Sequence, residues 1–112
     1  MAANDVFPKL LCNPTTLGTT TTTLFTVPSS HQYTIKQIVI CNTDGNDRWF
    51  TLAKGTAATA GNCFVYRLPI PAYDTIVIDT ALVLEATETI QGLSDTASVV
   101  TATITGWDRA TA

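Results

Sequence analysis

The stretch LPIPAYDTIVIDTALVLEATETIQG, residues 68–92, decides the fold that this sequence predicts. Pro69 and Pro71 have no backbone N–H to donate to a sheet ladder, so they indicate the end of one strand and a crossing segment. Apolar and polar residues then alternate with the two-residue period of half-buried strands. Three short strands are expected, beginning near Asp74, Leu82 and Ile90, with a bend at residues 80 and 81. Such strands are typical of half of a Greek-key or jelly-roll sandwich.

The rest of the chain supplies strands for a second sheet. Further strands are expected over residues 22–27, 33–42, 48–54, 63–68 and 99–107. Threonine occurs 22 times among the 112 residues, and β-branched side chains favour strands because they pack well on a pleated surface. No window shows the apolar period of a helix. We therefore predict an all-β protein, a single β-sandwich of about eight strands with a jelly-roll or Greek-key arrangement, over residues 22–112.

Residues 1–21 differ from the rest and are predicted to form an extended N-terminal arm. A short apolar piece containing Phe7, Leu10 and Leu11 precedes five consecutive threonines at 19–23, and such a run carries too little apolar surface to form a core layer. Two alternatives follow. The piece either anchors the arm on a neighbouring subunit or packs as an edge strand on its own domain. On the first alternative the arm is dispensable for folding and needed for attachment.

Charge is scarce in this chain. Charged residues make up 13% of it, with a net charge of −3 and six lysines and arginines, against about 25% charged residues in ordinary soluble domains. The chain therefore has no basic footprint for nucleic acid. It can stay soluble by hiding neutral, threonine-rich faces against neighbouring subunits or by covering a monomer with hydroxyl groups. We favour the first alternative and expect a homo-oligomer.

The sequence also predicts where the protein is made and whether it crosses a membrane. No apolar run approaches the ~18 residues of a membrane span, and residues 1–5 lack the basic and apolar regions of a signal peptide. We therefore expect a protein that is made in the cytoplasm and has no membrane partner. Cys12, Cys41 and Cys63 form an odd set without the spacing of a metal site, so free thiols are predicted.

No catalytic, cofactor or metal site is predicted. His31 is the only histidine, and nothing in the sequence supplies the oriented base and oxyanion site that Ser29 or Ser30 would need as a nucleophile. The acidic turn 42–47 lacks the glutamate that closes a calcium loop and is better read as a hairpin. Asp79 and Glu85 fall on outward strand positions, where solvated charges are usual. We therefore predict a protein that is not an enzyme.

Three further apolar residues alternate with core positions and are expected to point outward, namely Trp49, Val65 and Val77. An outward tryptophan on a sheet is either an interface anchor or a platform on which a sugar stacks. The second tryptophan, Trp107, is expected to cap the end of the sandwich. The predicted interface residues are therefore Phe7, Leu10, Leu11, Trp49, Val65 and Val77, and a glycan is a possible ligand.

Five segments carry a resemblance to a known class of proteins. They are LFTVP (24–28), IVICNT (38–43), RWFTL (48–52), YRLPIPAYDT (66–75) and LVLEATETI (82–90). In this order they resemble small virion structural proteins of tailed bacteriophages, over residues 24–107. Thr87-Glu88 stands where that pattern usually has Gly-Asp, a turn variant. The resemblance implies a virion protein, without fixing its place in head or tail, and brings no catalytic residues.

The composition and the resemblance together lead to one expected function and two alternatives. We expect a non-enzymatic cement or decoration protein on the capsid exterior, which clamps neighbouring major capsid proteins and forms a homotrimer. The first alternative is a β-domain associated with the tail or collar of the virion. The second is a carbohydrate-binding module displayed on the virion, with Trp49 as its sugar platform.

Overall fold

The computed structural model describes residues 5–55 and 61–111, and these residues form an all-β domain. The strands are β1 (Val6–Thr16), β2 (Thr22–Thr26), β3 (His31–Asn42), β4 (Arg48–Lys54), β5 (Cys63–Ile70), β6 (Thr75–Leu84), β7 (Thr89–Ser94) and β8 (Val100–Ala110). The predicted all-β class is confirmed. Within the described ranges, no helix has the length and apolar character needed to cross a bilayer.

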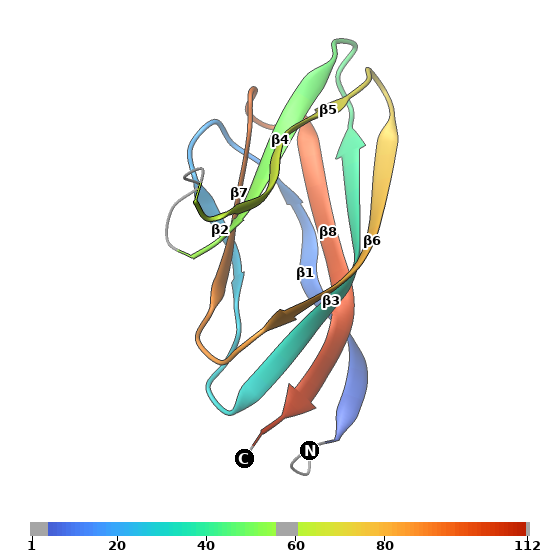
Figure 1. The fold of residues 1–112 in the computed structure, drawn as a ribbon. Helices are drawn as coiled ribbons and strands as arrows, with labels where there is room; N and C mark the ends of the chain where they lie inside the picture. The colour runs from blue at the N-terminus through green and yellow to red at the C-terminus, as the bar shows by residue number, and fades with distance from the viewer. Residues whose placement is uncertain (1–4, 56–60, 112) are drawn as a thin grey trace.

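The strands form two four-stranded antiparallel sheets that pack face to face (Figure 1). The first sheet has the order β1-β8-β3-β6 and the second has the order β2-β7-β4-β5. Successive strands alternate between the sheets except for the β4–β5 hairpin, which is the connectivity of a jelly roll. The predicted jelly-roll sandwich is therefore confirmed.

The core lies between the sheets and is filled by side chains that alternate inward along each strand. From β8, Val100, Ala102 and Ile104 are fully buried, as their alternation predicts. Phe50 and Leu52 of β4 cover them from the second sheet and are equally buried. Full burial of such side chains stabilises a fold by about 1.5–3 kcal/mol each, so this alternation is what drives the two layers together.

The central stretch contains two strands where three were predicted. The expected bend at residues 80 and 81 does not end the strand, because β6 runs from Thr75 to Leu84. Ile35 pairs with Leu82 and Gln37 pairs with Asp79, so β6 has one residue more than β3 between these pairs. That extra residue is a β-bulge, which bends a strand while the pairing continues on both sides.

Residues 6–16 form the edge strand β1 and pair along β8, from Val6 opposite Arg109 to Thr16 opposite Thr101. Of the two alternatives for this segment, the structure has the edge strand on its own domain. Two register shifts in β1 allow the adjacent residues Leu11 and Cys12 both to be buried. Whether residues 22–112 fold without β1 stays a prediction. The buried side chains of β1 argue that this segment is needed for folding.

Candidate interaction surface

The outer face of the sheet β1-β8-β3-β6 presents an exposed tryptophan on an inner strand, near one end of the sheet, and we call it the Trp107 face. Trp107 lies on β8 between Pro8 of β1 and Thr34 of β3, and Val83 of β6 continues the same row. Its side chain is 40% exposed. Trp107 does lie near one end of the sandwich, but it does not cap the core, because its alternation along β8 turns it outward from an inner strand of the sheet.

Two hollows flank Trp107 along β8. The larger, of about 450 Å³, is lined by residues that include Leu10, Lys36 and Thr105. The smaller, of about 220 Å³, is lined by Val6, Gln32, Thr34 and Arg109 in addition to Trp107. Trp107 is a wall of both hollows, so its ring stands between them. The face therefore combines one large aromatic ring with polar groups on either side.

The basic side chains differ in whether they pair with a carboxylate. Arg48 bridges Asp44 and Asp95, and Lys54 lies 2.7 Å from a carboxylate oxygen of Glu88. Lys36, by contrast, has no carboxylate partner among the described residues and is exposed. The larger hollow beside Trp107 consequently carries an uncompensated positive charge in a protein whose net charge is −3.

A polar cluster lies where β1, β3 and β8 end together. The carboxylate of Asp108 is buried, with 5% of its side chain exposed, and its Oδ1 atom lies 2.7 Å from His31 Nδ1. Lys9 Nζ lies 3.6 Å from Oδ2 of the same carboxylate and donates to the Tyr33 hydroxyl at 3.2 Å. The hydrogen bond to Tyr33, assisted by the charge of Asp108, raises the pKa of Lys9.

This cluster holds the end of β1 against β3 and β8, because each of those strands contributes a member. His31 was expected in a surface turn, whereas it opens β3 and is half-buried. Sequence reasoning could not find the cluster, since His31 and Asp108 are 77 positions apart. The imidazole is bonded to a buried carboxylate, which is a structural use of the residue.

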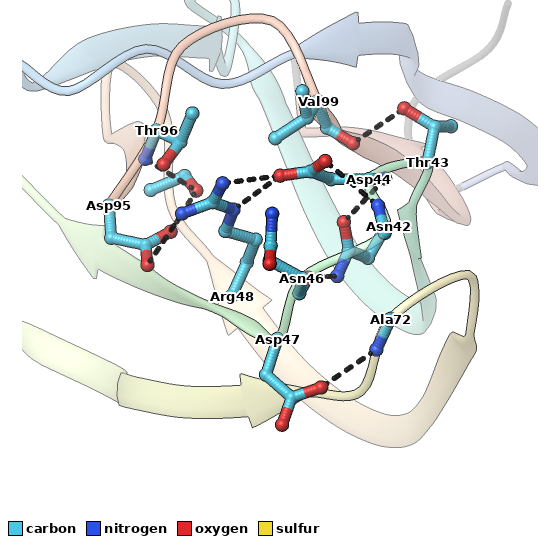
Figure 2. Close-up of polar contacts among 12 residues, drawn as sticks. Asn42, Thr43, Asp44, Asn46, Asp47, Arg48, Ala72, Asp95, Thr96 and Val99 are labelled. Carbon is cyan, nitrogen blue, oxygen red and sulfur yellow. Dashed lines mark hydrogen bonds and ion pairs between the residues drawn. The ribbon is translucent and has the colours of Figure 1, made fainter.

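The turn 42–47 is held by hydrogen bonds and ion pairs within its own loop and to two neighbouring loops, as Figure 2 shows. The Asn42 side-chain amide donates to the carbonyl of Asn46 at 2.9 Å and to the carbonyls of Ile70 and Pro71 at 3.2 Å. Asp47 accepts a hydrogen bond from the Ala72 backbone N–H at 3.0 Å. The turn therefore ties the β3–β4 and β5–β6 connections together at one end of the sandwich.

One acidic group of this turn, the Asp44 carboxylate, faces a guanidinium group. Arg48 Nε donates to Asp44 Oδ2 at 2.7 Å, and Arg48 also lies 3.8 Å from Asp95 (Figure 2). The hydrogen bond from Arg48 holds the pKa of Asp44 below its ordinary value. Across the described residues no group of three side chains is placed to hold a metal ion. The hairpin interpretation of this turn is wrong, because β3 and β4 lie in different sheets and the turn connects the two layers.

The predicted interface residues do not form one surface. Leu10 and Val77 lie on the Trp107 face, 47% and 53% exposed, at opposite edges of the sheet. Phe7 is 47% exposed but pairs with Asp108, so it lies toward the inner side at the end of the sheet. Leu11 is only 7% exposed and belongs to the core, so it cannot offer its area to a neighbour while the fold is intact.

The remaining two predicted residues lie on the second sheet. Trp49 is half-buried, and the Arg67 guanidinium lies over its ring, 4.9 Å from the ring centre. Val65 pairs with Leu52 and packs against the core, whereas it was expected to point outward. The alternation in β5 breaks because an extra residue, at a position where Arg67 has a φ of 47°, separates Val65 from Leu68.

The cysteines are not grouped. Cys12 is buried and Cys41 is half-buried, and neither forms a disulfide with another described residue. Burial raises the pKa of the Cys12 thiol, with a hydrogen bond to Thr15 opposing the shift. Buried thiols of raised pKa are weak nucleophiles, so Cys12 is a packing residue. The prediction that all three cysteines are free thiols stays a prediction.

Comparisons with known proteins show the fold. No protein-family model and no curated protein sequence matches this chain. A chain in the structure of the infectious bursal disease virus Gx strain is similar, with a TM-score of 0.60 and 10% identity, over 96% of this chain and 33% of that chain. A chain from Bacillus endospore appendages, which form disulfide-linked pili, has a TM-score of 0.60 and 10% identity, over 99% of this chain and 93% of that one.

The present chain therefore spans about a third of the viral chain and nearly all of the appendage chain. At 10% identity these likenesses show a shared fold and nothing finer. One neighbour comes from a virus, which agrees with the coarser part of the resemblance described above, and neither comes from a tailed bacteriophage. The common feature of the three chains is their fold.

Proposed function

We propose that this chain is a non-enzymatic structural subunit that assembles through the edge strand β6. Edge strands expose unpaired N–H and C=O groups and are templates for pairing with another chain unless they are blocked. The proposal is carried by the contrast between β6 and the other edges of the described sheets. Its finer form is a cement or decoration protein on a capsid exterior, which clamps major capsid proteins as a homotrimer.

Three edge strands carry features that hinder pairing. β1 has Pro8 and Lys9 in its first half and two register shifts. β5 has Pro69 and the bulge at Arg67. β2 is only five residues long and has a register shift of its own. Proline, lysine, bulges and short length are the devices by which proteins protect sheet edges.

The edge strand β6 is less protected. Its segment Thr75–Asp79 lies before the bulge and pairs regularly with β3. This segment contains no proline, and Asp79 is its only charge. On the Trp107 face Val77 and Val83 of β6 are 53% and 45% exposed. An isolated monomer would leave this apolar edge open, so a partner strand is the simplest use for it.

A matched pair of variants tests the proposal. Val77 and Val6 are both valines, both 53% exposed, and lie on the two opposite edges of one sheet. Val77→Lys places a charge on the proposed contact and is expected to shift the protein from oligomer to monomer, with unchanged circular dichroism. Val6→Lys on β1 is expected to leave the oligomer intact. Sedimentation velocity at micromolar concentration measures both.

Two outcomes would contradict the proposal. One is a wild-type protein that sediments as a monomer of 12.0 kDa. The other is an oligomer that both variants weaken equally, because the contact would then not lie on β6. A specific interface should bury about 800 Å² on each partner. Cryo-EM of intact particles then distinguishes capsid cement from a protein of the tail or collar.

A further inference from the structure

We infer that the two hollows beside Trp107 form a binding site for an acidic saccharide. This inference does not rest on the proposed assembly through β6, because the hollows lie over β1, β8 and β3. It names a different tryptophan from the one that the sequence suggested, since Arg67 covers the ring of Trp49. Trp107 instead stands exposed on the outer face of a sheet, between two hollows.

The ring of Trp107 supplies a stacking surface of fixed position. It lies on β8, an inner strand of its sheet that is paired on both sides, and Pro8 and Thr34 flank it across the strands. A tryptophan that is held in this way contributes a large rigid contact area at little cost in conformational entropy. Sugar rings have an apolar face that matches such a surface, and their hydroxyls need polar partners at its rim.

Polar groups are present at both rims. Lys36 and Thr105 line the larger hollow, and Gln32, Thr34 and Arg109 line the smaller one. Arg109 Nη1 donates to Gln32 Oε1 at 3.3 Å, and Gln32 Nε2 donates to Glu85 at 3.0 Å. The guanidinium and the Gln32 amide are therefore held in place at this rim, where they can border a bound sugar.

The charges select the class of saccharide. The larger hollow has Lys36 and the smaller has Arg109, so a cation lies on each side of the ring. No aspartate or glutamate is among the described residues that line either hollow. A chain of sugars that crosses Trp107 would thus meet the positive charge of Lys36 on one side of the ring and the hydrogen-bonded Arg109 and Gln32 side chains on the other. Uronic acids carry the complementary carboxylates.

The same features argue against a protein partner on this part of the face. Protein interfaces are depleted of charged residues at their centre, and lysine is among the depleted residues. Here Lys36 lines the hollow beside the central aromatic ring. The larger hollow, of about 450 Å³, is shallow and open to solvent, with one aromatic wall and a few polar groups, which suits a ligand that lies along the surface.

The test compares short α-1,4-linked oligogalacturonates with α-1,4-linked galactose oligomers of the same length, which differ only in the carboxylate. Titration of the intact protein, followed by tryptophan fluorescence and calorimetry, is expected to show binding of the acidic oligomer that weakens as salt is raised. Trp107→Thr, which suits a strand position, is expected to weaken binding by at least about tenfold. Lys36→Gln is expected to weaken it by about two- to fivefold.

Trp49→Phe is the matched control, because it changes the other tryptophan and should leave the affinity unchanged. Trp107→Tyr is expected to bind with an intermediate affinity, and circular dichroism shows whether each variant is folded. The inference is overturned if the acidic oligomer does not bind wild-type protein at millimolar concentration, or if the uncharged oligomer binds equally well. It is also overturned if folded Trp107→Thr loses self-association and neither saccharide binds.

Discussion

The outer faces of the two sheets differ in whether their tryptophan is exposed to solvent. On the second sheet, Thr51 and Ala53 alternate with the core residues of β4 and so face outward, yet they are 2% and 0% exposed. Arg67 of the bulged strand β5 lies over Trp49, and its backbone N–H donates to Thr51 Oγ1 at 3.0 Å. The first sheet leaves Trp107 40% exposed between two hollows. Alternation along a strand sets the side of the sheet to which a residue points, whereas side chains of neighbouring strands decide whether solvent reaches that residue.

Removal of the edge strand β1 is expected to disturb the Trp107 face more than any other change. A chain that begins at Thr21 lacks β1 and with it the buried side chains of Leu11 and Leu17. Each would forfeit about 1.5–3 kcal/mol, from a total stability of typically about 5–15 kcal/mol. We expect this truncated chain to lose its cooperative thermal transition. A chain that begins at Asp5 retains β1 and is the control.

Circular dichroism and thermal melting measure this effect. A Thr21 chain that melts cooperatively within a few degrees of the full chain would show that β1 is an accessory arm, as the sequence first suggested. In that case the accessible face would not depend on β1, and the contrast between the sheets would lie in β8 and β3 alone.

A smaller change beside Trp107 tests how closely β8 and β3 are packed. A Cβ atom on Gly106 would lie 1.9 Å from the carbonyl oxygen of Thr34. Since a backbone atom cannot move away as a side chain can, Gly106→Ala is expected to destabilise the fold by about 3 kcal/mol or more. Gly18→Ala is the control, because a Cβ at Gly18 meets nothing within 4 Å. Urea unfolding at neutral pH compares the two.

Equal stability of both glycine variants would mean that the strands beside Trp107 can separate without loss. The backbone of the Trp107 face could then change its spacing to fit a ligand. A large loss for Gly106→Ala alone would instead establish that the geometry of the two hollows is fixed by the backbone.

The sequence predicted the number of strands for partly mistaken reasons. It counted β6 as two strands and did not include β1 in the count, so the expected total still equals the observed one. Residues 80 and 81 do interrupt the pattern, but a bulge and a strand end look alike until the partner strand is known. Burial of Leu11 depends on β8, which lies some ninety positions further along the chain, so no local window could reveal it.

The candidate site was harder to predict than the fold. Trp49 and Trp107 are both on strands, and periodicity turns both outward. The difference between them comes from Arg67, whose backbone has a φ of 47° at a bulge. A single sequence carries no signal for that conformation at a non-glycine residue. The pairing of His31 with Asp108 was hidden for the same reason, since it depends on the register of β3 with β8.

The smallest expected effect on stability comes from an ion pair that lies away from the Trp107 face. Lys54 Nζ lies 2.7 Å from Glu88, with side chains 40% and 28% exposed. The hydrogen bond from Lys54, followed by one from the Glu85 backbone N–H, lowers the pKa of Glu88 from 4.5. Because the folded-state pKa lies below the unfolded one, this contribution is complete above about pH 4.5 and is lost as the pH falls through the folded value.

Lys54→Gln should therefore cost about 0.5 kcal/mol at pH 7, since the pair is largely exposed to solvent. The loss relative to wild type should shrink as the pH falls below the folded pKa of Glu88, because the protonated carboxyl no longer attracts a cation. Lys36→Gln is the matched control, and its unfolding free energy should differ little from wild type at either pH, since Lys36 has no carboxylate partner among the described residues. Urea unfolding at pH 7 and at pH 3 measures both variants. A Lys36→Gln protein that loses as much stability as Lys54→Gln at pH 7 would place Lys36 in an ion pair of the fold, and its charge would then not be available to a ligand beside Trp107.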